Sequence, residues 1–152
     1  MTIPRNLGTF AKYAGTATLP VFSIPSAGET TTVSATAATG TVNFDAITQS
    51  VLYYTSNASG NWTLNIRGNS TTTMNSFMST GQSVAIVFAV TQGGTAYYNS
   101  AVTIDGTSVT PIWQGGTAPT AGNASSVDTY TYNVVKTGSA TYTVFAALTQ
   151  FK

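Results

Sequence analysis

The chain has 152 residues, a length that suits one domain with a short additional segment. Only 6% of its residues are charged, against about 25% in a typical soluble domain, and the net charge is +1. The scattered charges exclude a basic stripe for nucleic acid and a polybasic patch for a membrane surface. The absence of histidine and cysteine excludes imidazole chemistry, disulfides and thiolate metal sites.

A surface with so few charges must consist mainly of Thr, Ser, Asn, Gln, Gly and Ala. Such a surface costs little to desolvate, because few full charges lose their hydration. Free monomers usually carry more charge, which keeps them soluble. The composition therefore favours a component packed against many neighbours. A hydroxyl-rich β-protein that is simply soluble is the alternative.

Residues 1–28 are predicted to form an N-terminal arm. Residues 6–14 place apolar side chains at i, i+3, i+4 and i+7, which predicts a short amphipathic helix. Residues 16–28 contain two prolines and no regular period, as expected of an extended arm. The helix either docks on its own domain or anchors the protein to a partner. The candidate anchor residues of this arm are Leu7, Phe10, Tyr13 and Phe22.

From residue 29 the pattern changes to short β-runs separated by turns. The run 61–67 alternates Trp62, Leu64 and Ile66 with polar residues, and 82–90 is apolar on both faces. The pair Asp105-Gly106 between two β-runs predicts a two-residue hairpin turn. Thr137-Gly138 predicts another turn. The expected strand runs are 29–36, 40–46, 49–55, 61–67, 82–90, 101–110, 127–135 and 140–148.

One short helix interrupts this series of strands. Met74, Phe77 and Met78 have helical spacing after a Ser/Thr cluster, which predicts a helix at one end of the sheets. About nine strands with frequent turns predict an all-β domain over residues 29–152, an antiparallel β-sandwich or jelly roll. No sequence period of 20–50 residues repeats, which argues against a solenoid.

Few residues of this chain could perform catalysis. The four acidic residues are far apart in sequence, and Asp105 is already explained by its turn. Lys136 lies near a strand end, where a solvated lysine is expected. No glycine loop for phosphate and no calcium-loop spacing occurs. We therefore expect a non-enzymatic protein without a catalytic site, cofactor or metal.

The aromatic residues are the better candidates for binding. Tyr53-Tyr54 and Tyr97-Tyr98 are adjacent pairs, and neighbours in a strand point to opposite faces. One tyrosine of each pair is therefore expected in the core and the other outside, in a protein interface or a glycan site. Trp113 continues the alternation of Val109, which predicts an inward position or a subunit contact. The uncharged stretch 113–123 (WQGGTAPTAGN) is predicted to be an ordered connection at the domain's end.

Several blocks of the sequence resemble a known family. IPRNLGTFAKYAG at the start resembles the N-terminus of many structural proteins of marine bacteriophages, especially those that infect cyanobacteria. Residues 43–69 and 79–138 resemble a domain that recurs in the virion proteins of these phages. The resemblance covers about two-thirds of the chain, while residues 16–42 match no such block.

This resemblance implies a non-enzymatic virion structural protein that forms homo-oligomers, with a trimer favoured. A short chain with an anchor suits a capsid decoration or cement protein that binds the major capsid protein or another virion protein. The alternative is a fibre or knob of the head or tail that binds a host surface glycan. Either role implies synthesis in the host cytoplasm and a place on the surface of the particle, with no contact to nucleic acid or membrane.

Overall fold

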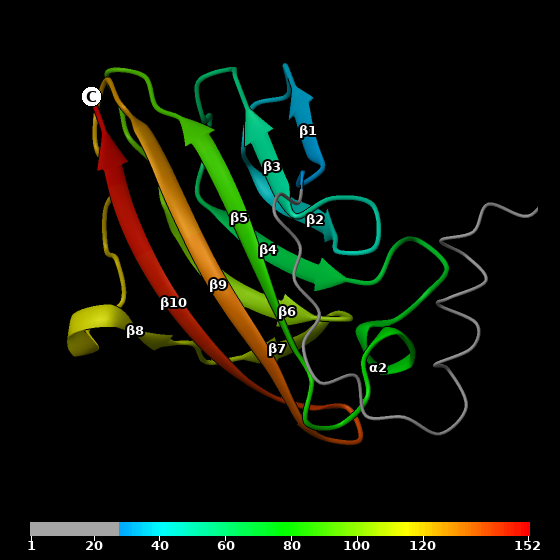
Figure 1. Ribbon diagram of the computed structural model, residues 1–152. Coiled ribbons are helices and arrows are strands. Elements are labelled where there is room, and N and C mark those ends of the chain that lie inside the picture. Colours follow the sequence, from blue (N-terminus) through cyan, green and yellow to red (C-terminus); the bar gives the residue numbers. More distant parts are fainter. Residues whose placement is uncertain (1–27) are drawn as a thin grey trace, which may run out of the picture.

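The computed structural model describes residues 28–152, which form a β-sandwich with one short α-helix. The all-β prediction is therefore confirmed, whereas the arm helix and Leu7, Phe10, Tyr13 and Phe22 lie outside the described residues. Figure 1 shows the larger sheet in front of the smaller one. The strands are β1 (Thr31–Ser34), β2 (Gly40–Asp45), β3 (Val51–Tyr54), β4 (Trp62–Arg67), β5 (Ser83–Thr91), β6 (Asn99–Ile104), β7 (Thr107–Val109), β8 (Ile112–Trp113), β9 (Val127–Gly138) and β10 (Thr141–Phe151).

The two sheets contain six and four strands. The larger has the order β1-β3-β5-β9-β10-β8, and the smaller has the order β2-β4-β6-β7. Through its first six strands the chain crosses from one sheet to the other after every strand. Successive strands of the same sheet therefore run parallel, from β1 through β3 to β5 and from β2 through β4 to β6.

The expectation of antiparallel pairing needs correction. Only β5 with β9, β9 with β10, and β6 with β7 are antiparallel, so both sheets are mixed. The physical reason lies in the connections, because a hairpin gives an antiparallel neighbour, whereas a connection that crosses over returns the chain parallel. Residues 35–39 and 55–61 make such crossings between the sheets.

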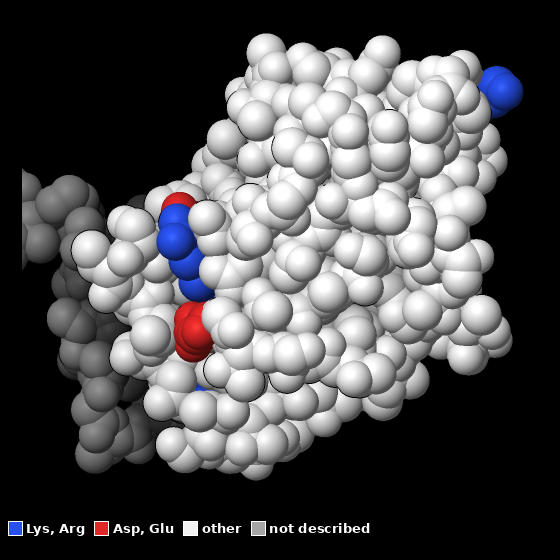
Figure 2. Space-filling model, turned by 180° about the vertical axis from the view of Figure 1, so that it is seen from behind, with Lys and Arg blue, Asp and Glu red and all other residues white. Residues whose placement is uncertain are grey.

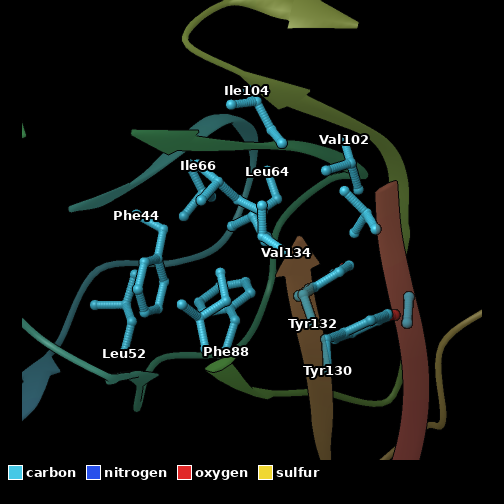
Figure 3. Packing of buried hydrophobic residues seen from close by; sticks show 14 of the residues in the cluster. Phe44, Leu52, Leu64, Ile66, Phe88, Val102, Ile104, Tyr130, Tyr132 and Val134 are labelled. Atoms are coloured by element: carbon cyan, nitrogen blue, oxygen red, sulfur yellow. The ribbon is translucent and has the colours of Figure 1, made fainter. Parts of the chain in front are cut away.

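The core lies between the sheets and follows the alternation expected from the sequence. Trp62, Leu64 and Ile66 of β4 face Phe88 of β5 and the inward tyrosines of β9, all of them buried. Figure 3 shows Leu64, Ile66, Phe88, Tyr130 and Tyr132 meeting in the middle of the sandwich. Trp62 makes edge-to-face contacts with Phe88 and Tyr130, with ring centroids 5.8 and 5.7 Å apart. Such pairs contribute about 0.5–1.5 kcal/mol beyond their buried area.

The predicted helix is confirmed as α2 (Met74–Phe77), at one end of the sandwich (Figure 1). The Thr73 hydroxyl accepts a hydrogen bond from the backbone N–H of Ser76 at 3.1 Å and so caps its first turn. The carboxylate of Asp105 accepts from the backbone N–H groups of Met74 (2.9 Å) and Asn75 (3.3 Å). Asp105 therefore joins the β6–β7 turn to the helix start, in addition to the turn role expected from sequence.

Lys136 does not lie in solvent, contrary to the sequence expectation. Its side chain is 6% exposed, and Nζ donates hydrogen bonds to the carbonyls of Asn75 (2.6 Å) and Met78 (2.7 Å). The inward direction of alternate β9 residues places this ammonium group against the last turn of α2. A cation there complements the unpaired carbonyls at a helix C-terminus.

The hairpin turns agree with the sequence in one case and differ in the other. Asp105 and Gly106 both have positive φ (51° and 81°), as a two-residue turn of this type requires. The β9–β10 turn lies at Ser139 and Ala140, two residues beyond the predicted Thr137-Gly138. Backbone pairing continues to Gly138, which extends β9 past the dipeptide that predicted a turn.

Candidate interaction surfaces

Among residues 28–152, none of the side chains on the outer side of the six-stranded sheet is charged. We call this side the neutral face. It comprises the outward residues of six neighbouring strands: Thr31, Val33, Val51, Tyr53, Ser83, Ala85, Val87, Ala89, Thr91, Ile112, Val127, Thr129, Thr131, Asn133, Val135, Thr137, Thr143, Phe145, Ala147, Thr149 and Phe151. Strand register aligns these residues in rows, such as Val51, Val87, Thr131 and Ala147.

Large apolar side chains stand out from this neutral face. Val33, Ile112, Phe145 and Phe151 are between 48 and 63% exposed. Ile112 and Phe145 lie directly opposite each other on β8 and β10. A shallow depression of about 350 Å³ lies beside them, with Thr131 in its lining. Grouped apolar side chains of this kind are typical of contact surfaces, whereas single exposed ones need no explanation.

The outer side of the four-stranded sheet is different, because its polar groups bind one another. Asn65 donates to the side chain of Asn43 (2.8 Å) and accepts from Thr103 (2.8 Å), across three parallel strands. In the next row, Arg67 Nε lies 2.6 Å from Asp45 Oδ1. Figure 2 views the molecule from behind and shows the few coloured atoms gathered toward one side and at a corner. Most of this surface is neutral as well, but its amides already have partners.

A buried carboxylate fixes the loop that precedes β9. Asp128 is fully buried, and its oxygens accept from the side chain of Asn123 (2.7 Å) and from the backbone N–H of Asn123 (2.9 Å). Gln92 Nε2 donates both to Asp128 (3.1 Å) and to the carbonyl of Tyr97 (2.6 Å). This network ties the β5–β6 connection to the end of the loop 117–123.

Two buried tyrosines meet one asparagine in the core. Tyr132 donates to Asn99 Oδ1 (3.0 Å), and the oxygen of Tyr130 accepts from the Asn99 backbone N–H (3.3 Å). Burial raises the pKa of both phenols above the ordinary value, because ionised oxygens would lose their hydration. These phenols are structural groups that stay protonated at neutral pH.

The stretch 113–123 encloses a hollow beside β10. Trp113 packs against Tyr130 and Tyr132, with ring centroids 6.4 and 6.1 Å apart, so it faces inward as expected. Residues 114–116 make one 3-10 turn with positive φ at Gly115 and Gly116. The hollow has a volume of about 720 Å³, and none of the described residues that line it is charged. Its lining is Trp113, Gln114, Thr117, Ala118, Pro119, Thr120, Ala121, Gly122, Asn123, Leu148 and Gln150.

The strand that carries Trp113 differs from the sequence interpretation. Val109 lies in β7 of the smaller sheet, whereas Trp113 lies in β8 of the larger one. Residues 110 and 111 carry the chain between the sheets, so the alternation through Val109 and Trp113 does not describe one strand. Trp113 nevertheless faces inward, because β8 pairs with β10 in a register that aligns it with the buried Ala146.

The other aromatic candidates are divided between surface and core. Tyr53 faces out, whereas Tyr54 packs against Phe88 in the core with ring centroids 5.2 Å apart. This pair therefore has one inward and one outward tyrosine, as expected. The strand alternation expected for Tyr97 and Tyr98 is wrong, because both lie in the connection before β6, outside any strand, and both are half-buried. Sequence reasoning missed the neutral face as a site. The sequence feature that could have revealed the neutral face is the absence of charge at the outward positions of successive strands.

Comparisons with protein-family models, curated proteins and solved structures found no match to this chain. Within residues 28–152, no group of three or more acidic, cysteine or histidine residues could hold a metal ion. No helix in the described part of the chain is long and apolar enough to cross a membrane. The candidate functional features of this protein are therefore the surfaces described above.

Proposed function

We propose that this protein is a non-enzymatic structural subunit of a bacteriophage particle, and that the neutral face packs against neighbouring virion proteins. The observation that carries this proposal is the neutral face itself, a six-stranded surface without a charged side chain. The sequence resemblance to virion proteins of marine phages is the reason for proposing that the assembly is a phage particle. A capsid decoration or cement role suits a β-domain whose broad outer sheet is uncharged.

The chemistry of the neutral face supports extensive packing. Its hydroxyl, methyl and phenyl groups lose little hydration energy on contact, whereas buried charges would need partners. Apolar area contributes about 25 cal/mol for each Å² removed from water. Phe145, Ile112 and Phe151 would supply the largest gains, because much of each side chain is exposed. Depletion of charge with enrichment of aromatic groups is typical of interface centres.

The copy number in purified particles tests the location. Quantitative mass spectrometry against the major capsid protein should give hundreds of copies for a decoration protein. Three to a few tens of copies would instead indicate a fibre or a tail component. Absence from intact particles would refute the virion role altogether.

A matched pair of variants tests the surface. Thr131→Arg places a charge at the centre of the neutral face, and Thr63→Arg places one on the opposite sheet. We expect Thr131→Arg to reduce binding to particles lacking the protein by at least tenfold, because the guanidinium would be buried without a partner. Thr63→Arg should bind as the unchanged protein does. Equal binding by both variants would show that the neutral face is not the interface.

A fibre or knob protein that binds a host glycan is the second candidate. The observation that favours it is the hollow, where an indole lies near the amides of Gln114, Asn123 and Gln150. Aromatic faces and amide groups are suited to sugar rings. A glycan array with the isolated protein tests this role, and Gln150→Ala should abolish any specific signal. Binding that survives this substitution would place the glycan elsewhere.

A further inference from the structure

Among residues 28–152, no strand pairs with the edge of β10 beside the hollow over its last five residues. Strand β8 pairs with β10 only at Phe145 and Ala146, and the chain then turns away through residues 114–116. Within residues 28–152, no strand pairs with Ala147–Phe151 on the side away from β9. An open edge of this kind presents N–H and C=O groups to any extended segment that lies alongside.

The opposite wall of the hollow also offers backbone groups. In the described part of the chain, residues 117–121 make no hydrogen bond to another segment. Both ends of this wall are nevertheless fixed. Trp113 packs into the core at one end, and Asn123 binds the buried Asp128 at the other. The hollow is thus a preformed slot between two backbones, which lowers the cost of binding an extended segment.

We propose that this slot binds residues 19–23 of a neighbouring copy as an added β-strand. This segment, LPVFS, belongs to the sequence outside the described residues, and no charge occurs between Lys12 and Glu29. Five extended residues cover about 17 Å, the same length as Ala147–Phe151. Neutral groups would therefore meet a neutral slot along the whole open edge.

The proline within the segment and the one just after it both fit an edge position. Pro20 lacks an N–H group, so the even residues cannot supply a full set of bonds to a partner strand. Leu19, Val21 and Ser23 have their N–H and C=O groups on the other side of an extended chain, and these would pair with β10. Pro25, two residues after Ser23, would end the pairing.

Chain length favours a neighbouring copy over the same chain. Thr31 of β1 lies in one row with Ala147 of β10, at the opposite side of the sheet. The slot is thus five strand spacings from β1, roughly 24 Å. The eight Cα–Cα steps from Ser23 to Thr31 reach at most about 29 Å when fully straight, so a connection within one chain would have to run nearly straight across the twisted sheet. A segment from another copy needs no such stretched connection.

Such contacts would join copies head to tail. The donor segment precedes β1 at one edge of the sheet, and the slot lies at the other edge. A heterologous contact of this kind closes into a ring when the rotation between copies allows it. This inference deepens the proposed assembly role, because it assigns the contact between copies to the slot and leaves the neutral face for other virion proteins.

Cross-linking between two full-length variants tests this inference directly, since the protein contains no cysteine. A tagged Val21→Cys chain is mixed with Thr149→Cys, or with Thr141→Cys at the far end of the same strand. A short bis-maleimide should then link Val21→Cys to Thr149→Cys at least fivefold more than to Thr141→Cys. Equal yields of the two cross-links would overturn the proposal. A chain that carries both Val21→Cys and Thr149→Cys gives a second check. If its cross-link formed within one chain while the oligomers persisted, the proposal would be overturned as well.

A second measurement keeps the test independent of the cysteines. Val21→Asp should lower the oligomer mass in sedimentation, because a charge would enter the uncharged slot, whereas Ser26→Asp should leave it unchanged. An unchanged mass for Val21→Asp would contradict the inference. Glycan binding in the slot of an intact oligomer would overturn it as well. If the chains failed to cross-link but still bound to particles, only the contact at the slot would be refuted. The proposed function would stand, since it depends on the neutral face.

Discussion

Replacing Lys136 by methionine removes two hydrogen bonds from the interior. The ammonium group donates to the carbonyls of Asn75 and Met78 at 2.6 and 2.7 Å and so holds the last turn of α2 against β9. Methionine keeps the apolar stem and a similar volume, which limits the loss of packing. The substitution therefore tests the two hydrogen bonds more than it tests the filling of space.

The magnitude follows from these two contacts. A hydrogen bond to a charged group contributes about 1.5–3 kcal/mol, so two bonds give at most about 6 kcal/mol. In the unfolded chain the Lys136 ammonium group is hydrated, and folding removes this hydration at a cost in free energy. The methionine variant avoids that cost, which offsets part of the loss. We expect the free energy of unfolding to fall by about 2–4 kcal/mol. For a chain of this size that corresponds to a decrease in Tm of roughly 5–15 °C.

Urea denaturation followed by tryptophan fluorescence measures this loss, because Trp62 is buried in the core. Lys152→Met is the matched control, since Lys152 is exposed at the chain end and should change the free energy of unfolding by less than about 0.5 kcal/mol. If Lys136→Met were as stable as Lys152→Met, the two hydrogen bonds would contribute nothing, and the reasoning would be wrong.

Two further predictions concern close packing and pH. Gly122→Ala should lower the free energy of unfolding by about 1–3 kcal/mol, because its Cβ would clash with the Tyr97 carbonyl oxygen; Gly94→Ala, with open space around it, is the control in thermal denaturation. Burial raises the pKa of Tyr130 and Tyr132, so only the unfolded chain loses these protons just above pH 10. The free energy of unfolding should then fall by about 1.4 kcal/mol per pH unit for each phenol. Denaturant titrations should show a smaller slope in Tyr132→Phe, and a flat profile would contradict the assignment.

The sequence predicted the sandwich and most of its core, because side-chain alternation reports burial directly. Trp62, Leu64 and Ile66 alternate with polar residues and are buried in the structure. The same alternation places Tyr130 and Tyr132 inside, across from the tryptophan. Asp105-Gly106 predicted its turn because few residues tolerate positive φ at both positions.

The parallel winding could not be predicted in the same way. Alternation is identical in parallel and antiparallel strands, so it does not reveal which strands are neighbours. Aligned residues such as Thr31, Val51 and Val87 are separated by 20 and then 36 residues, so no fixed period marks the turns of the chain. The longer second interval contains α2, which adds residues between β4 and β5 without changing the alignment.

The candidate surfaces were predictable only in outline. Low charge indicated an interface, but not which sheet would carry it. Lys136 and Asp128 could not be assigned from sequence, because their partners Met78 and Gln92 lie 58 and 36 residues away along the chain. The slot depends on β8 being shorter than β10, which is a property of pairing and not of local residue pattern.

The neutral face lacks charge because the chain has few charged residues and because those few lie elsewhere. Asp128 and Lys136 are buried, Asp105 caps a helix, and Asp45 pairs with Arg67. The remaining charged side chains of residues 28–152 are Glu29 and Lys152, near the two ends of the described chain. The neutral face between them needs no charge for folding, so a charge added there should alter stability by less than about 0.5 kcal/mol. A large effect on particle binding with an unchanged fold would therefore separate the interface from the core, which is why Thr131→Arg is the informative substitution.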